Sequence, residues 1–192
     1  MSVRSQIQPL ASSQSQLMLV GQVTLGALAL ALLSQVKIAM PGTPIPLTLQ
    51  VLAVILLGGV LGPRLAVAAV AEYLLLGVCG LPVFNNWAAG LGTMLGATGG
   101  YLFAFLPAAA LCGALYHRFA TQPYGMRVAG AALAGLAGVV VIYLGGWVWL
   151  ACWAHISLAK AFVAGVAPFI TVDILKVSAA ASLLALRRKG AA

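Results

Sequence analysis

The chain has 192 residues, of which 63% are hydrophobic and only 6% are charged. A soluble domain usually has about a quarter of its residues charged, so this composition excludes a water-soluble globule and indicates an integral membrane protein. The formal net charge of +8 does not indicate nucleic-acid binding, because the basic residues form no cluster beside a soluble aromatic surface.

A short polar tail and six apolar segments follow one another along the chain. Residues 1–16 are predicted to form an N-terminal tail, and residues 17–189 a single transmembrane domain. The apolar segments are residues 17–37, 46–62, 65–84, 95–117, 128–150 and 168–187. Each is close to the ~20 residues with which an α-helix crosses a bilayer. We therefore predict an all-α membrane protein, a bundle of six transmembrane helices.

The first apolar segment is long for the core of a signal peptide, and we predict that it is retained as a transmembrane helix. It contains Ala27 and Ala31, which lie one helical turn apart and are small enough for close contact with another helix. The residues alone leave open whether that helix belongs to this chain or to a partner protein.

The basic residues in the connections predict the orientation of the bundle. An even number of spans places both termini on one side, and short cytoplasmic loops are enriched in lysine and arginine. The basic residues on the side of the termini are Arg4, Arg64, Arg118, Arg127, Arg187, Arg188 and Lys189. Only Lys37 and Lys160 fall in connections on the opposite side. Both termini are therefore predicted to be cytoplasmic.

Three connections on the predicted outer side carry residues that could line one small-molecule pocket. They are "MPGTPIPLTLQ" before the second segment, "LPVFNNW" after the third and "GATGGY" at the start of the fourth. The candidate binding residues in them are Gln50, Asn85, Asn86, Trp87, Gly100 and Tyr101. Each motif also has a local interpretation: the glycines could pack helices, the asparagines could end a helix, and Gln50 could cap one.

Asp173 and Lys176 lie in the last apolar segment, and their spacing places them on one face of a helix. Charged groups in hydrocarbon cost several kcal/mol unless they are paired or solvated, so they usually indicate function. One interpretation is a structural ion pair that holds the bundle together. The other is the polar part of a ligand site that opens to the outside. Glu72, the second acid of the chain, either faces a water-filled interior or pairs with Lys176.

The sequence contains no set of residues that indicates catalysis or a bound metal. The three cysteines are far apart within apolar runs, and His117 and His155 fall in different parts of the chain. There is no GxxxxGKS/T motif for ATP and no Ser–His set or pair of acids. We therefore predict neither an enzyme nor a resident cofactor, and any energy for transport must come from separate subunits.

Four motifs, "IPLTLQ", "LGPRLAVAAVAEYLLLGVCGLPVF", "GATGGYLFAF" and "PFITVDILK", follow one another between about Met40 and Lys176. Together they resemble the successive signatures of the BioY family, the biotin-capturing S components of energy-coupling factor (ECF) transporters. The resemblance implies six transmembrane helices, cytoplasmic termini and a biotin site that faces the outside of a prokaryotic cytoplasmic membrane.

The resemblance also implies roles for the candidate residues. Those implied to bind biotin are Asp173, Lys176, Tyr101 and either Asn85 or Asn86. The face of the first helix with Ala27 and Ala31 is implied to contact a transmembrane coupling protein, which works with two ATPase subunits. Two alternatives remain open: an S component for another vitamin, and a solo facilitator or channel for a small solute.

Overall fold

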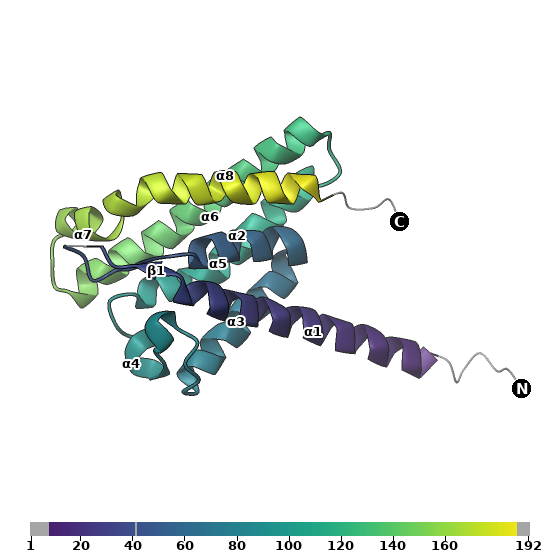
Figure 1. Cartoon of the computed structure of the whole chain (residues 1–192), viewed down its shortest axis with the longest axis horizontal. Helices are drawn as coiled ribbons and strands as arrows, with labels where there is room; N and C mark the ends of the chain where they lie inside the picture. The colour runs from purple at the N-terminus through teal and green to yellow at the C-terminus, as the bar shows by residue number, and fades with distance from the viewer. Residues whose placement is uncertain (1–7, 41, 188–192) are drawn as a thin grey trace, which may run out of the picture.

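The structure, a computed structural model, describes residues 8–40 and 42–187, with side chains from residue 14 onward (Figure 1). Its helices are α1 (Gln8–Gln35), α2 (Gln50–Leu61), α3 (Pro63–Val78), α4 (Gly90–Met94), α5 (Gly99–Phe119), α6 (Tyr124–Trp153), α7 (Leu158–Gly165) and α8 (Ile170–Leu186). Two 3-10 turns, η2 (Asn85–Trp87) and η3 (Ala167–Phe169), precede α4 and α8. Strands β1 (Lys37–Ile38) and β2 (Leu47–Thr48) pair antiparallel between α1 and α2.

Each predicted apolar segment contains a helix, and the prediction of an all-α membrane protein is confirmed. Within the described residues, four segments are long and apolar enough to cross a membrane: Gln14–Gln35, Gly99–Phe119, Tyr124–Trp153 and Leu158–Leu186. Helices α2 and α3 have 12 and 16 residues, about 18 and 24 Å of helix, less than the ~30 Å of a hydrocarbon core. Helices α4 and α7 lie between predicted apolar segments, and strand β2 occupies the start of the segment 46–62 that was predicted to be helical.

The turn between α2 and α3 explains why these two helices are short. Gly62 has a φ of +82°, which L side chains rarely adopt, and Pro63 begins α3 with the fixed φ that suits a first helical turn. A Cβ atom at Gly62 would also lie 3.1 Å from the ring of His117 in α5. These two residues therefore end one helix and start the next without a loop between them.

Helix α5 lies at the centre of the bundle, in contact with α2, α3 and α6, while α8 packs against α6 and α2 (Figure 1). Glycines bring the backbones of α5 and α6 close together, as in many membrane helix pairs. A Cβ atom at Gly100 would overlap Trp149 and the carbonyl oxygen of Gly145 in α6. Gly100 was predicted to bind ligand, but the structure places it in this helix contact because only a residue without a side chain fits there.

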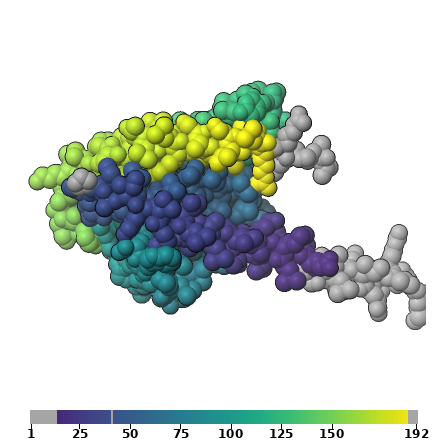
Figure 2. Space-filling view, viewed as in Figure 1, coloured from purple at the N-terminus to yellow at the C-terminus, as the bar shows by residue number. Residues whose placement is uncertain are grey.

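Helix α1 is the least buried of the long helices, and its N-terminal half extends beyond its neighbours (Figures 1 and 2). Ala27 is nevertheless fully buried, and partly buried Ala31 packs against the same hydrophobic core. The burial of Ala27 within this chain leaves it no surface for a coupling protein, whereas Ala31 is only partly buried. The exposed face of α1 carries Leu25, Leu28 and Leu32 instead.

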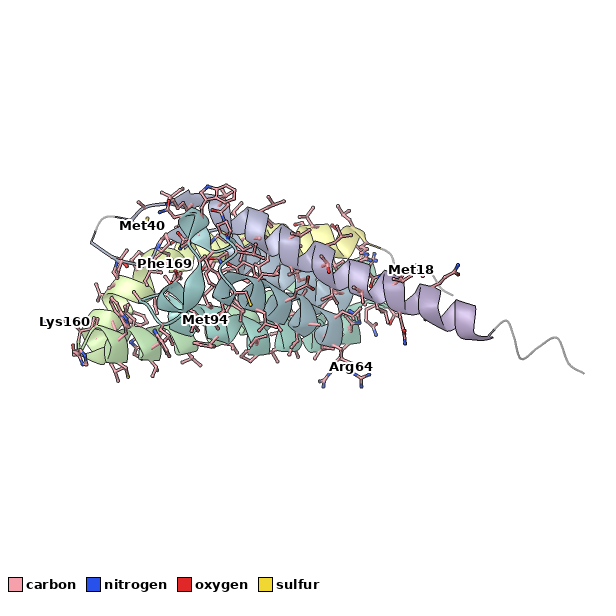
Figure 3. The ribbon with its side chains drawn as sticks, turned by 90° about the horizontal axis from the view of Figure 1, so that it is seen from below. Met18, Met40, Arg64, Met94, Lys160 and Phe169 are labelled. Carbon is pink, nitrogen blue, oxygen red and sulfur yellow. The ribbon has the colours of Figure 1, made fainter. Side chains whose placement is uncertain are left out.

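Basic residues gather at one end of the bundle, and Lys160 and Arg64 lie toward opposite ends of the packed helices (Figure 3). Close to Arg64, Arg187 donates from Nη1 to the carbonyl oxygen of Val60 at 3.0 Å, at the C-terminal end of α2. Arg127 Nη1 in turn lies 3.4 Å from the carbonyl oxygen of Arg187. Three residues that were counted with this basic end lie outside the described residues: Arg4, Arg188 and Lys189.

Candidate functional site

A cavity with about 630 Å³ of empty space, including its opening, lies at the end of the bundle where α7 and the hairpin are found. Strand β2, the loop before α4 and parts of α2, α5, α6 and α8 contribute to its wall. Five of the predicted ligand-binding residues line it: Gln50, Asn85, Tyr101, Asp173 and Lys176. The predicted convergence of distant segments on one pocket is therefore present for these residues.

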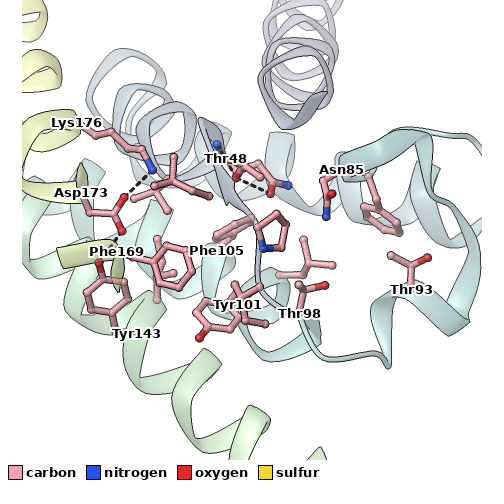
Figure 4. Close-up of a pocket in the computed structure, with 18 residues that line it drawn as sticks. Thr48, Asn85, Thr93, Thr98, Tyr101, Phe105, Tyr143, Phe169, Asp173 and Lys176 are labelled. Carbon is pink, nitrogen blue, oxygen red and sulfur yellow. Dashed lines mark hydrogen bonds and ion pairs between the residues drawn. The ribbon is translucent and has the colours of Figure 1, made fainter. Parts of the chain in front are cut away.

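Asp173 and Lys176 form a buried ion pair at one end of the cavity (Figure 4). Lys176 Nζ donates to Asp173 Oδ1 at 2.6 Å, and the two residues are 6% and 2% exposed, respectively. Asp173 lies in the first turn of α8, just after the 3-10 turn with Pro168, where the positive end of the helix dipole stabilises a carboxylate. Lys176 therefore pairs with an acid on its own helix, Asp173, and not with Glu72.

Tyr143 joins this pair from a second helix, α6. Its hydroxyl donates to Asp173 Oδ2 at 2.6 Å, so each oxygen of the carboxylate accepts one short hydrogen bond. Hydrogen bonds to ionised groups are roughly twice as strong as neutral ones. Tyr143 was not predicted from the sequence, where its only signal is a phenol hydroxyl within "GVVVIYLGG", an apolar stretch that offers it no partner.

Gln50 lies in another part of the wall, at the start of α2. Its Oε1 accepts from Thr48 Oγ1 at 3.0 Å, and its Nε2 donates to the hydroxyl of Tyr73 in α3 at 2.8 Å. Thr48 Oγ1 also accepts the backbone N–H of Gln50 at 3.3 Å. Both polar atoms of the Gln50 side chain are thus bonded within the protein, and the residue gives the cavity wall its shape.

The C-terminal end of α1 holds the loop that carries Asn85. Ser34 Oγ donates to the carbonyl oxygen of Val83 at 2.8 Å, and Gln35 Nε2 donates to that of Phe84 at 3.0 Å. Phe84 and Asn85 then line the cavity. The roles of Ser34 and Gln35 were not predicted, because a side chain bound to a backbone carbonyl far along the chain leaves no pattern in the sequence.

Asn86 and Trp87 were predicted to bind ligand, but neither lines the cavity. Both have positive φ values, 61° and 57°, which non-glycine residues rarely adopt. Asn86 Oδ1 accepts from Lys37 Nζ at 2.6 Å on the surface of the molecule. Trp87 is 66% exposed, and its backbone N–H donates to Gln35 Oε1 at 3.0 Å.

Tyr101 lines the middle of the cavity with its ring, while its hydroxyl donates to the carbonyl oxygen of Gly165 at 2.6 Å and ties α5 to α7. Phe84, Phe105 and Phe169 also line the cavity. Figure 4 shows Phe105, Tyr101 and the hydrogen-bonded Thr48 between Asp173 and Lys176 on one side and Asn85 on the other. The cavity is therefore polar at its two ends and mainly aromatic between them, where the side chains of Thr48 and Gln50 are hydrogen-bonded within the protein.

The end with Asn85 adjoins the N-terminus of α5. Thr98 precedes the helix and lines the cavity, and the positive end of a helix dipole stabilises an anion. Among the described residues, no group of three or more His, Cys, Asp or Glu side chains could hold a metal ion. The arrangement suits a ligand with a neutral polar ring, an apolar middle and an anionic end.

Comparison with known proteins identifies relatives over most of the chain. A model of the BioY family matches residues 7–191. The chain is 42% identical over 170 residues to a probable biotin transporter BioY of Pyrococcus horikoshii, covering 88% of this chain and 96% of the relative. It is 40% identical over 152 residues to the biotin transporter BioY of Thermotoga maritima, covering 79% and 85%. The crystal structure of the S-component for biotin from an ECF-type ABC transporter matches with a TM-score of 0.81 and 25% identity, covering 92% of this chain and 94% of that chain.

Proposed function

This chain belongs to the BioY family, and we propose that it binds biotin in the cavity for uptake across the cytoplasmic membrane of a prokaryote. In this proposal it is the substrate-binding subunit of an ECF-type transporter. A transmembrane coupling protein and two ATPase subunits supply the energy, since the chain has no ATP-binding motif.

The observation that carries the proposal is the buried pair of charges at one end of an aromatic cavity. The ureido ring of biotin presents an N–H donor beside a carbonyl acceptor. Asp173 can accept a hydrogen bond from that N–H, and Lys176 can donate one to the carbonyl oxygen. The pair therefore stays neutralised when the cavity is empty and gains two matched partners when biotin binds.

The rest of the ligand fits the remainder of the cavity. The thioether ring and the aliphatic chain of biotin would lie against Tyr101, Phe105 and Phe169. The valerate carboxylate would then reach the end with Asn85 and the N-terminus of α5, where an amide and the helix dipole favour an anion. The carboxylate has no arginine partner in this arrangement.

The packed core of the bundle favours a binding subunit over a channel. Between the cavity and the basic end, the described helices are joined by buried apolar side chains, among them Ile55, Val139, Val177 and Leu184. A facilitator for a polar solute needs a continuous polar path through this region. Apolar packing closes the cavity toward the basic end, as is required of a protein that captures its ligand.

Binding of biotin by the purified protein tests the proposed function. We expect biotin to remain bound during purification. The bound biotin should exchange with added biotin, but thiamine and riboflavin should not displace it. Isothermal titration against each vitamin measures the selectivity. Binding of another vitamin without biotin would identify an S component of different specificity, and binding of none would contradict the proposal.

We further propose that all six apolar segments cross the membrane, with both termini and the Arg64 end in the cytoplasm and the cavity open to the outside. The separation of Lys160 from Arg64 along the bundle supports this orientation (Figure 3). In this proposal the short helices α2 and α3 each cross beside α5, which contacts both of them and is itself long enough to span the membrane.

Single cysteines in two glycine positions test the orientation. Gly92 and Gly125 are both exposed and lie before and after α5, and a Cβ atom added to either would have no neighbour within 4 Å. Cys79 and Cys152, which are exposed, are first replaced with serine, whereas buried Cys112 is kept. We expect an impermeant thiol reagent to label Gly92→Cys in intact cells and to leave Gly125→Cys unlabelled until the membrane is opened. The reverse pattern would invert the proposed orientation.

A further inference from the structure

We propose that Tyr143 is a positioning residue that sets the specificity of the site for a ureido group, by fixing the direction in which Asp173 presents its free acceptor sites. The inference rests on the proposed function, because it places the ureido group of the ligand against Asp173 and Lys176. Two observations support it. The first is the geometry of Tyr143, Asp173 and Lys176, and the second is Tyr116, which hydrogen-bonds to α8 without contacting Asp173.

Tyr143 and Lys176 hold the carboxylate of Asp173 from two sides. The Tyr143 hydroxyl lies 2.6 Å from Oδ2, and Lys176 Nζ lies 2.6 Å from Oδ1. Figure 4 shows the two side chains approaching the carboxylate from opposite directions, all three within the cavity lining. Rotation of the carboxylate about its Cβ–Cγ bond would break both hydrogen bonds, so its plane is fixed.

The number of acceptor sites links this geometry to specificity. A carboxylate has about four lone-pair sites, two on each oxygen. Tyr143 and Lys176 occupy one site on each oxygen of Asp173, which leaves one on each for groups in the cavity. A ligand with an N–H beside a carbonyl matches Asp173 and Lys176 together. Without the Tyr143 hydroxyl, Oδ2 has two free sites and less of its negative charge is compensated, which favours a cationic ligand.

A tyrosine can link a neighbouring helix to α8 without a hydrogen bond to the carboxylate of Asp173. Tyr116 in α5 also binds to α8, but its hydroxyl donates to the backbone carbonyl oxygen of Leu184 at 2.8 Å. Tyr116 is buried in the separate hydrophobic cluster near the basic end and does not line the cavity. It provides a control with the same residue type and the same partner helix as Tyr143, and with no contact to Asp173.

The test compares Tyr143→Phe with Tyr116→Phe in purified protein, using biotin and 2-iminobiotin as ligands. In 2-iminobiotin a protonated guanidine replaces the urea, so the acceptor next to Lys176 becomes a cationic donor. We expect Tyr143→Phe to lower the affinity for biotin about tenfold and to change that for 2-iminobiotin less than about threefold. Tyr116→Phe should leave both affinities unchanged. Isothermal titration gives the affinities, and thermal unfolding shows how far each variant is destabilised.

Three outcomes distinguish the possibilities. A fall of at least about threefold in the ratio of biotin affinity to 2-iminobiotin affinity, seen in Tyr143→Phe and not in Tyr116→Phe, supports the positioning role. An equal loss of affinity for both ligands, or no loss for biotin, would show that Tyr143 only links α6 to α8 and would overturn this inference while the proposed function stands. Absence of biotin binding by the parent protein would overturn the proposed function and the inference with it.

Discussion

Replacing Asp173 with asparagine is expected to lower the affinity for biotin at least about tenfold, with the protein still inserted in the membrane. Asparagine keeps the shape of the side chain but offers a neutral amide in place of a carboxylate that accepts two hydrogen bonds of 2.6 Å. Hydrogen bonds to charged groups contribute about 1.5–3 kcal/mol, and about 1.4 kcal/mol corresponds to tenfold in affinity. The change also leaves Lys176 as an unpaired buried cation. Isothermal titration of the purified variant measures the loss.

The double variant Asp173→Asn with Lys176→Met separates a role in binding from a role in holding the bundle. No lone charge remains in it, so its thermal stability should exceed that of Asp173→Asn alone. Its affinity for biotin should stay low, because the acceptor and the donor for the ureido group are both gone. Binding as tight as that of the parent would show that the pair only stabilises the fold and that biotin lies elsewhere.

Replacing Gly100 with alanine is expected to destabilise the contact between α5 and α6. The added methyl group would overlap Trp149 and the carbonyl oxygen of Gly145, and neither backbone can move without separating α5 from α6. Overpacking of this kind costs about 1–3 kcal/mol, so the midpoint of thermal unfolding should fall by several degrees, about 2–4 °C per kcal/mol for a chain of this size. Circular dichroism of the detergent-solubilised protein measures the midpoint.

Gly125→Ala is the matched control for that substitution. Gly125 lies in the second position of α6, and a Cβ atom there has no neighbour within 4 Å. Alanine is favoured over glycine in a helix by roughly 0.5–1 kcal/mol, so this variant should be as stable as the parent or slightly more stable. Equal stability of Gly100→Ala and Gly125→Ala would contradict the close contact between α5 and α6.

The sequence predicted well those features that rest on a repeated pattern of residues or on a residue type that is energetically unfavourable in a membrane. Runs of apolar residues locate the long helices, and the charges of Asp173 and Lys176 are so unfavourable in hydrocarbon that their pairing could be expected. Asn85 and Tyr101 were placed at the cavity because their motifs lie in connections on one side of the bundle. These inferences need only the spacing of residues along a helix and the order of the segments.

The features that could not be predicted depend on side-chain direction and on contacts between distant segments. Asn86 and Trp87 have positive φ values and do not line the cavity, whereas their neighbour Asn85 does. Ala27 and Gly100 carry the same signal, a small residue in a membrane helix, whether the contact is internal, with a partner or with a ligand. Only the three-dimensional arrangement separates these cases.

The ion pair of Asp173 and Lys176 also determines how the membrane potential acts on the protein. A single charge that crosses the whole membrane gains or loses about 2.3 kcal/mol per 100 mV. The two charges lie on one helix and sum to zero, so a displacement of α8 along the electric field moves no net charge from this pair. At this site, voltage therefore acts only through the charge that the ligand itself brings, and the empty pair is electrically silent.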